Sequence, residues 1–244
     1  MGDRYEILSA TIPAFFQNVP IAHISGGELS NGSKDDVIRH LITKLSSLHF
    51  VSAEIHKKRV IQLGEPDTNV FNVGEPGLDA LVDMKFIGKR KLEHKLGLVL
   101  DRKFLLMTVH PEDSHLNELE GSSLIDGLCT ALEEFPDKKV ICTLPNSDEG
   151  SVMIKNKILD FREKNSDRFY VFPSLGRLVY LSLVKLSEAV IGNSSSALVE
   201  VPFLGVPSVD IGVRQSGRLR SNTVVQVSRK PEEIIEGIRK VTSP

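Results

Sequence analysis

Cysteine is scarce in this chain of 244 residues, which contains only Cys129 and Cys142. Two cysteines are too few for a disulfide framework or a cysteine-based zinc site, so we expect both to be small buried hydrophobic residues in a reducing compartment. Histidines and cysteines nowhere have the spacing of metal ligands, and the chain has neither a Gly-x-Gly-x-x-Gly fingerprint nor a Walker phosphate loop. The sequence therefore predicts no metal site.

Excess charge and long apolar runs are also lacking. The 30 basic and 32 acidic side chains leave a net charge of -2, so no global basic field attracts nucleic acid or an anionic membrane. No apolar run approaches the roughly 20 residues that span a bilayer, and the N-terminus lacks the basic-then-apolar pattern of a signal peptide. We therefore expect a cytoplasmic protein without nucleic-acid or membrane partners. Any phosphate group must be bound by local arginines and backbone amides.

Short β-branched runs alternate with longer amphipathic stretches along the whole chain. This alternation predicts an α/β protein with mostly parallel sheets and helices on both faces. We expect strands at residues 21–24, 48–52, 70–73, 103–109, 140–144, 169–172, 189–192, 207–211 and 223–227. We expect helices at residues 35–47, 53–63, 116–134, 151–164, 176–186 and 231–241, and from the 193–196 segment through Leu204.

A break rich in turn residues, Gly74-Glu75-Pro76-Gly77, follows the third predicted strand. We place the domain boundary there. Residues 1–74 are expected to form the C-terminal part of a first Rossmann-like domain, and residues 75–244 a second Rossmann-like domain. The chain opens on loop-like residues with no strand before them, so we expect the first domain to be incomplete.

Small hydroxyl residues follow the strand predicted at 189–192. A strand–serine–helix junction gathers backbone N–H groups and the positive end of the helix dipole, which is a natural phosphate site. Ser194 and Ser195 can cap the helix and also donate to phosphate oxygens. Glu200 lies further along the same helix, where a carboxylate can accept hydrogen bonds from ribose hydroxyls. An ordinary serine N-cap explains the same pattern.

Other polar residues also follow predicted strands, where ligands bind in open parallel sheets. Arg214 lies in a glycine-bounded loop, and arginine forks suit a diphosphate group; a solvated surface loop is the alternative. His110 ends the 103–109 strand and can donate to phosphate or transfer protons, although a structural histidine is equally compatible. Asn146 follows the strand at 140–144.

Acidic and basic residues gather near the predicted strand ends of the N-terminal part. Paired carboxylates beside histidine and arginine can supply a general base and a general acid. Helix capping by Asp35 and surface ion pairs, such as Asp36 with His40 one turn apart, would use the same residues. The set comprises Asp3, Arg4, His23, Ser25, Glu28, Asp35, Asp36, Arg39 and His40.

Seven motifs occur in a fixed order, and together they resemble the hydrolysing UDP-N-acetylglucosamine 2-epimerases of sialic-acid biosynthesis and the N-terminal half of the bifunctional animal enzyme. The similarity runs along essentially the whole chain, and its specificity lies in the order of the motifs. They are Gly2-Asp3-Arg4-Tyr5-Glu6, His23-Ile24-Ser25-Gly26-Gly27-Glu28, the segment from Asp35-Asp36 to Lys44, Val109-His110-Pro111-Glu112, Pro145-Asn146-Ser147-Asp148, Gly192-Asn193-Ser194-Ser195-Ser196 through Glu200, and Arg214-Gln215-Ser216-Gly217-Arg218.

The resemblance implies a glycosyltransferase-B-like pair of Rossmann-type domains with the active site between them, and no metal or redox cofactor. The implied reaction is elimination of UDP with deprotonation at C2, followed by hydration of a bound glycal to N-acetylmannosamine. By resemblance UDP is held by His110, Asn146, Ser194, Ser195, Glu200 and Arg214. By resemblance Asp3 and Asp35 fall on acid–base positions, with Arg4 and His23 nearby, and residues 75–244 are the UDP-binding domain. Together with the strand-end cluster, this leads us to expect acid–base chemistry on Asp3, Glu28, Asp35 and His110. We expect further substrate contacts from Arg4, His23, Arg39 and His40.

Two features depart from the family pattern. The family begins further upstream, at a strand and a Gly-x-Arg loop, and ends in additional helices, so we expect a truncated chain from a homo-oligomeric parent. Ser25 also stands where many relatives have a glutamate. Four alternatives stay open: a relative acting on a UDP-di-N-acetylated 6-deoxy sugar of the legionaminic type, a non-hydrolysing 2-epimerase, a non-catalytic UDP-binding fragment, and a glycosyltransferase, which the fold alone does not exclude.

Overall fold

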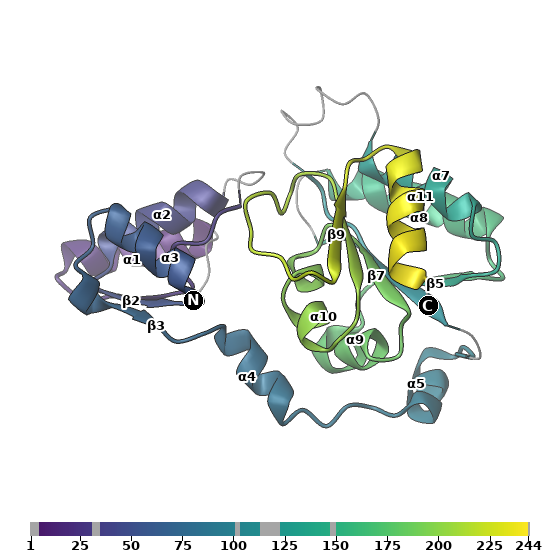
Figure 1. The fold of residues 1–244 in the computed structure, drawn as a ribbon, viewed down its shortest axis with the longest axis horizontal. Helices are drawn as coiled ribbons and strands as arrows, with labels where there is room; N and C mark the ends of the chain where they lie inside the picture. The colour runs from purple at the N-terminus through teal and green to yellow at the C-terminus, as the bar shows by residue number, and fades with distance from the viewer. Residues whose placement is uncertain (1–4, 31–34, 101–102, 113–122, 147–149, 244) are drawn as a thin grey trace. The chain divides into compact units, whose positions relative to one another are not determined.

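The computed structural model describes residues 5–30, 35–100, 103–112, 123–146 and 150–243. They divide into two compact units (Figure 1). Unit 1 groups the described residues up to Met84 with Ser216–Arg218. Unit 2 groups those from Lys85 to Gln215 with those from Leu219 onward.

Unit 1 contains a small parallel sheet in the order β1-β2-β3. Its core is built from Val51, Val60 and Val70, which are completely or almost completely buried. The elements are α1 (Tyr5–Phe16), β1 (Ala22–Ile24), α2 (Asp35–Leu45), β2 (Leu48–Val51), α3 (Glu54–Gln62), the 3₁₀ turn η1 (Asp67–Asn69), β3 (Val70–Asn72) and α4 (Pro76–Val82).

Unit 2 contains a six-stranded, fully parallel sheet in the order β6-β5-β4-β7-β8-β9. Numbered within this sheet the order is 3-2-1-4-5-6, that of dinucleotide-binding folds, and the order in which strands are added reverses between β4 and β7. The strands are β4 (Phe104–Thr108), β5 (Lys139–Thr143), β6 (Phe169–Phe172), β7 (Ala189–Gly192), β8 (Ser208–Ile211) and β9 (Val224–Val227).

Helices pack on both faces of this sheet, and each face has its own apolar core. One core joins the sheet to α7 (Leu124–Glu133), α8 (Ser151–Lys164) and α11 (Pro231–Thr242). The other joins it to α5 (Lys89–Leu96), α9 (Gly176–Val184) and α10 (Glu200–Phe203). The expected α/β class with parallel sheets is thus confirmed. None of the helices in the described part of the chain combines the length and apolar character of a membrane span.

Two of the expected helices are wrong in their extent. Ser123 is extended (φ −72°, ψ 145°) and caps α7, so no single helix runs through it from 116 to 134; residues 116–122 lie outside the described residues. The helix expected through Leu204 is instead a 3₁₀ turn, η2 (Ser195–Ala197), followed by the four-residue α10. Pro202 has no N–H to donate to the carbonyl of Leu198, which a continuous helix would require.

The break expected at 74–77 holds for Gly74 and Glu75 but is wrong for Pro76 and Gly77, which lie in the first turn of α4. Glu75 accepts a hydrogen bond from the backbone N–H of Gly77, and Pro76 occupies the first turn of α4. These residues therefore begin a helix. Helix α5, which ends at the left-handed Gly97, and helix α1, which contains Pro13, were not expected.

Candidate nucleotide site and a second polar cluster

The ends of β4 and β7 approach closely at the point where the strand order of the sheet reverses. Gly192 ends β7 with φ 134°, and a Cβ atom there would lie 1.9 Å from the carbonyl oxygen of Thr108. The backbone N–H of Asn193 donates to that same oxygen over 3.2 Å. Only glycine fits this contact. Gly192 therefore allows the ends of β4 and β7 to meet at the crevice in which such sheets bind their ligands.

Asn193 joins three segments of the chain at this crevice. Its completely buried side chain accepts a hydrogen bond from the His110 N–H (2.7 Å) and donates to the His110 carbonyl (2.9 Å). Its own carbonyl accepts from Gln215 Nε2 (3.0 Å) and Arg214 Nη1 (3.3 Å). Two of the expected UDP-binding residues, His110 and Arg214, are therefore brought together through Asn193.

A buried carboxylate holds the loop that carries Arg214. One oxygen of Glu112 accepts from the backbone N–H groups of Val213 and Arg214, each over 3.0 Å. The other lies 2.5 Å from Arg229 Nη2, and both side chains of this ion pair are at most 2% exposed. Gly212 has φ 83°, and a Cβ there would meet the Glu112 carboxylate at 2.5 Å. Two successive amides facing one anion form a nest whose geometry does not depend on solvent.

A second carboxylate, Asp210 of β8, holds the far end of the same loop. Its Oδ2 accepts from Arg220 Nη2 (2.9 Å) and Nε (3.3 Å), and Nη2 also donates to the Gln215 carbonyl over 3.0 Å. Burial raises the pKa of Asp210, while the Arg220 guanidinium lowers it. The loop is thus anchored from the sheet at both ends, and Arg214 is presented from a defined backbone.

Hydroxyl groups line the start of the segment after β7. Ser194 Oγ accepts from the Ser196 N–H over 3.4 Å and caps η2, which begins at Ser195. Burial raises the pKa of Tyr180; the Ser196 hydroxyl lowers it, and the Glu200 carboxylate raises it. Serine capping, the alternative named for this segment, is therefore present. Because η2 and α10 are so short, the dipole of a long helix does not act at this segment, and the donors it offers are serine N–H and O–H groups.

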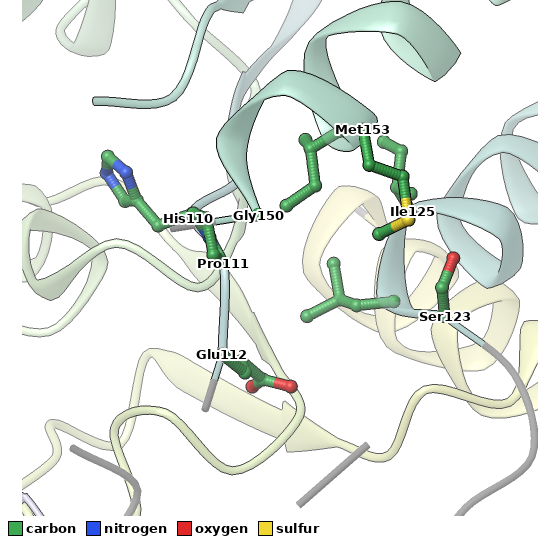
Figure 2. A pocket seen from close by; sticks show the side chains of 9 residues that line it. His110, Pro111, Glu112, Ser123, Ile125, Gly150 and Met153 are labelled. Carbon is green, nitrogen blue, oxygen red and sulfur yellow. The ribbon is translucent and has the colours of Figure 1, made fainter. Parts of the chain in front are cut away.

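A small cavity of about 60 Å³ lies beside His110, Pro111 and Gly150 (Figure 2). The His110 ring points away from Ser123 and Met153. Ligand pockets for drug-sized molecules usually enclose about 300–1,000 Å³, so this cavity is too small to be the nucleotide pocket. Its lining is His110, Pro111, Glu112, Ser123, Leu124, Ile125, Gly150, Met153 and Ile154. Asn146 is exposed and follows the end of β5.

In unit 1, Asp36 organises the start of α2. It accepts from the Ser30 N–H (2.6 Å), lies 3.5 Å from Arg39 Nη1, and pairs with His40 Nε2 at 3.6 Å. Burial lowers the pKa of His40, and Asp36 raises it. The neighbouring Asp35 is the first residue of α2. The structure thus joins three of the expected polar residues, Asp36, Arg39 and His40, in one cluster.

Arg39 and His23 support the loop after β1 from inside the unit. Arg39 is 2% exposed and donates to the Glu28 carbonyl over 3.1 Å. His23 is buried, with its Nδ1 3.1 Å from Thr43 Oγ1, which in turn donates to the Arg39 carbonyl over 3.0 Å. Ser25 has φ 65°, an uncommon conformation for a residue other than glycine. Asp3 and Arg4 lie outside the described residues.

Sequence reasoning missed residues that make many of these contacts. Asn193 and Glu112 each lie within a quoted motif next to an expected residue, so their motifs were a usable signal. No quoted motif contains the others, and their side-chain partners in these contacts lie ten or more positions away in the sequence. They are Tyr180, Asp210, Arg220 and Arg229.

The sheet order of unit 2 and the polar groups converging where it reverses define a Rossmann-type α/β protein. The family model described as UDP-N-acetylglucosamine 2-epimerase matches residues 1–244, and the chain belongs to this family. The resemblance stated from the seven motifs is therefore confirmed.

Individual relatives agree with this assignment. The "GDP/UDP-N,N'-diacetylbacillosamine 2-epimerase (hydrolyzing)" of Campylobacter jejuni is 41% identical over 92% of this chain, and the polysialic acid biosynthesis protein P7 of Escherichia coli is 40% identical over 98%. The chain spans 58% and 60% of their lengths. The solved UDP-GlcNAc 2-epimerase of Neisseria meningitidis, bound to UDP-GlcNAc, has a TM-score of 0.82 at 19% identity, covering 98% of this chain and 66% of that one. The glycosyltransferase-B-like fold class is thus confirmed.

Proposed function

We propose that this chain serves a hydrolysing UDP-sugar 2-epimerase that converts UDP-N-acetylglucosamine and water into N-acetylmannosamine and UDP. The observation that carries the proposal is the Asn193 junction, which holds His110 and Arg214 together where a Rossmann-type sheet binds nucleotides. The family match along the whole chain supports the same activity.

The nucleotide-binding roles in this proposal fall on residues of unit 2. Arg214 and His110 bind the diphosphate, since a guanidinium fork and an imidazole N–H both donate to phosphate oxygens. Ser194 and Ser195 add hydroxyl donors, and Glu200 accepts from the ribose hydroxyls. Asn146 contacts UDP from the loop after β5.

The acid–base roles fall mainly on unit 1. A carboxylate removes the C2 proton, the electron pair forms a C1–C2 double bond, and the C1–O bond to UDP breaks. Water then adds to this glycal. Asp3, Glu28 and Asp35 are the proposed acid–base residues, with His110 assisting the leaving group. Arg4 and His40 bind the sugar, and the buried His23 and Arg39 act by holding the loop that carries Glu28.

A second substrate is favoured by a specific observation. The C. jejuni relative, at 41% identity, is named for a diacetylbacillosamine nucleotide, so a UDP-di-N-acetylated 6-deoxy sugar is the alternative substrate. Because the chain spans about 60% of the length of such relatives, binding of UDP without turnover is the third candidate. A cytoplasmic location and a homo-oligomeric state stay predictions from the sequence.

Product analysis tests the proposed activity. The chain is incubated with UDP-N-acetylglucosamine, and separately with the di-N-acetylated nucleotide, and the products are followed by proton NMR. We expect free N-acetylmannosamine and UDP from the first substrate, and about a 10²-fold or greater loss of rate in Glu28→Gln, since general base catalysis contributes this much. Accumulation of UDP-N-acetylmannosamine would contradict the hydrolysing reaction, and turnover of the second substrate alone would establish the alternative.

A further inference from the structure

Three side chains of unit 1 form a hydrogen-bonded chain that the sequence gives no sign of. Ser52 Oγ lies 3.0 Å from Glu28 Oε1 and 2.9 Å from His56 Nδ1. Glu28 follows β1, Ser52 follows β2, and His56 lies in α3. The carboxylate can only accept, so the single hydroxyl hydrogen of Ser52 points to Glu28. Ser52 must then accept from His56, which places the imidazole proton on Nδ1.

The surroundings of His56 favour its neutral form. The residue is 6% exposed. Burial lowers the pKa of His56, and the Glu28 carboxylate acts against this effect. Three guanidinium groups lower the pKa further: those of Arg59, Arg39 and Arg218. A neutral imidazole with its proton on Nδ1 donates to Ser52. A protonated imidazolium would be repelled by these three guanidinium groups.

Close packing and hydrogen bonds fix the backbone around the Glu28–Ser52–His56 side chains. Gly27 has φ 78°, and a Cβ there would lie 2.6 Å from the His56 carbonyl oxygen. The Gly27 carbonyl accepts a hydrogen bond from Arg59 Nη1, and the Glu28 carbonyl accepts one from Arg39 Nη1. The loop that carries Glu28 therefore packs against α3. Neither Glu28 nor His56 can move relative to Ser52 without breaking these contacts.

We propose that Ser52 and His56 are positioning residues that aim the Glu28 carboxylate for proton transfer. This inference rests on the proposed function for the base role of Glu28. The order of the chain is that of an activated base oriented by a second group, which is itself oriented by a third. Ser52 fixes one carboxylate oxygen, and the Nδ1 proton of His56 fixes the Ser52 hydroxyl.

Nitrogen-15 NMR of the histidine rings tests the Glu28–Ser52–His56 hydrogen bonds directly. We expect the neutral ring of His56, assigned by the loss of its signals in His56→Asn, to carry its proton on Nδ1. We expect Ser52→Ala to move that proton to Nε2 in a substantial fraction of molecules, and Ser52→Thr to preserve the Nδ1 form. Ser46→Ala is the matched control, because within the described residues the Ser46 hydroxyl bonds only to the Ile42 carbonyl. A His56 ring protonated on Nε2 in the parent chain, or unchanged in Ser52→Ala, would overturn the inference.

Turnover separates positioning from a purely structural role. We expect Ser52→Ala to lower kcat about 10- to 100-fold with little change in KM, since misplacement of a catalytic group by about 1 Å costs this much. Ser52→Thr and His56→Asn, whose amide N–H can replace Nδ1–H, should retain more activity than Ser52→Ala and His56→Gln respectively. Unchanged kcat in Ser52→Ala would overturn the inference while leaving the proposed function intact. Absence of product from the parent chain would contradict the proposed function, and the tautomer would then decide the inference alone.

Discussion

Replacing Arg229 with methionine is expected to lower the free energy of unfolding by about 3–5 kcal/mol, the usual cost of breaking a buried ion pair. The Arg229 guanidinium is 1% exposed and faces the Glu112 carboxylate, which is 2% exposed. Without Arg229 that carboxylate stays buried, and within the described part of the chain its remaining donors are the N–H groups of Val213 and Arg214. Urea unfolding followed by circular dichroism measures the loss.

Two control variants make this prediction specific. The double variant Glu112→Gln/Arg229→Met removes both charges and should be less destabilised than Arg229→Met alone. Lys157→Met breaks the ion pair with Asp126, whose two side chains are 35% and 50% exposed, and should cost only about 0–1 kcal/mol. A loss in Arg229→Met no larger than that in Lys157→Met would show that the buried pair does not hold the loop.

Replacing Gly192 with alanine is the second change with a large expected effect. The new Cβ would lie 1.9 Å from the Thr108 carbonyl oxygen, and φ at this position is 134°. The unfavourable backbone conformation costs about 1–2 kcal/mol, and forced overpacking adds about 1–3 kcal/mol. Because Asn193 bonds to both Thr108 and His110, relief of the clash should also weaken UDP binding. Thermal unfolding and UDP titration of the same variant measure the two effects.

Gly205→Ala is the matched control for Gly192→Ala. Gly205 also has a positive φ, 75°, but apart from its chain neighbours no atom of the described residues lies within 4 Å of the position of an added Cβ. We expect only the backbone cost of about 1–2 kcal/mol there, with UDP binding unchanged. Equal losses of stability and of UDP affinity in the two variants would refute the close approach of β4 and β7 as the basis of the crevice.

Local pattern predicted most of the sheet but not every helix. Strands such as β4 and β7 are buried on both faces, and buried parallel strands read as continuous apolar runs. Pro76 and Gly77 read as a turn, because proline is common both in turns and at the first position of a helix. The apolar pattern around Pro202 predicted a continuous helix, but the missing N–H of this proline interrupts that helix.

The candidate site was predictable where a residue follows a strand. His110, Arg214 and Glu200 were expected on this ground or from the serine junction. The partners that fix them were not, because the Glu112–Arg229 pair joins residues more than a hundred positions apart. Such pairs exist only once the sheet order brings strand ends together. The Glu28–Ser52–His56 chain depends in the same way on the parallel pairing of β1 and β2.

Titration of UDP into the chain by calorimetry tests the central claim, that the loops at the reversal point of the unit 2 sheet bind the nucleotide. We predict binding by the parent chain and about a 10-fold or greater loss of affinity in Arg214→Ala and in Glu200→Ala, since hydrogen bonds to charged groups contribute about 1.5–3 kcal/mol. Arg162→Ala, at an exposed position of α8, should bind as the parent does. Failure of the parent to bind UDP, or equal affinity in all three variants, would contradict the account.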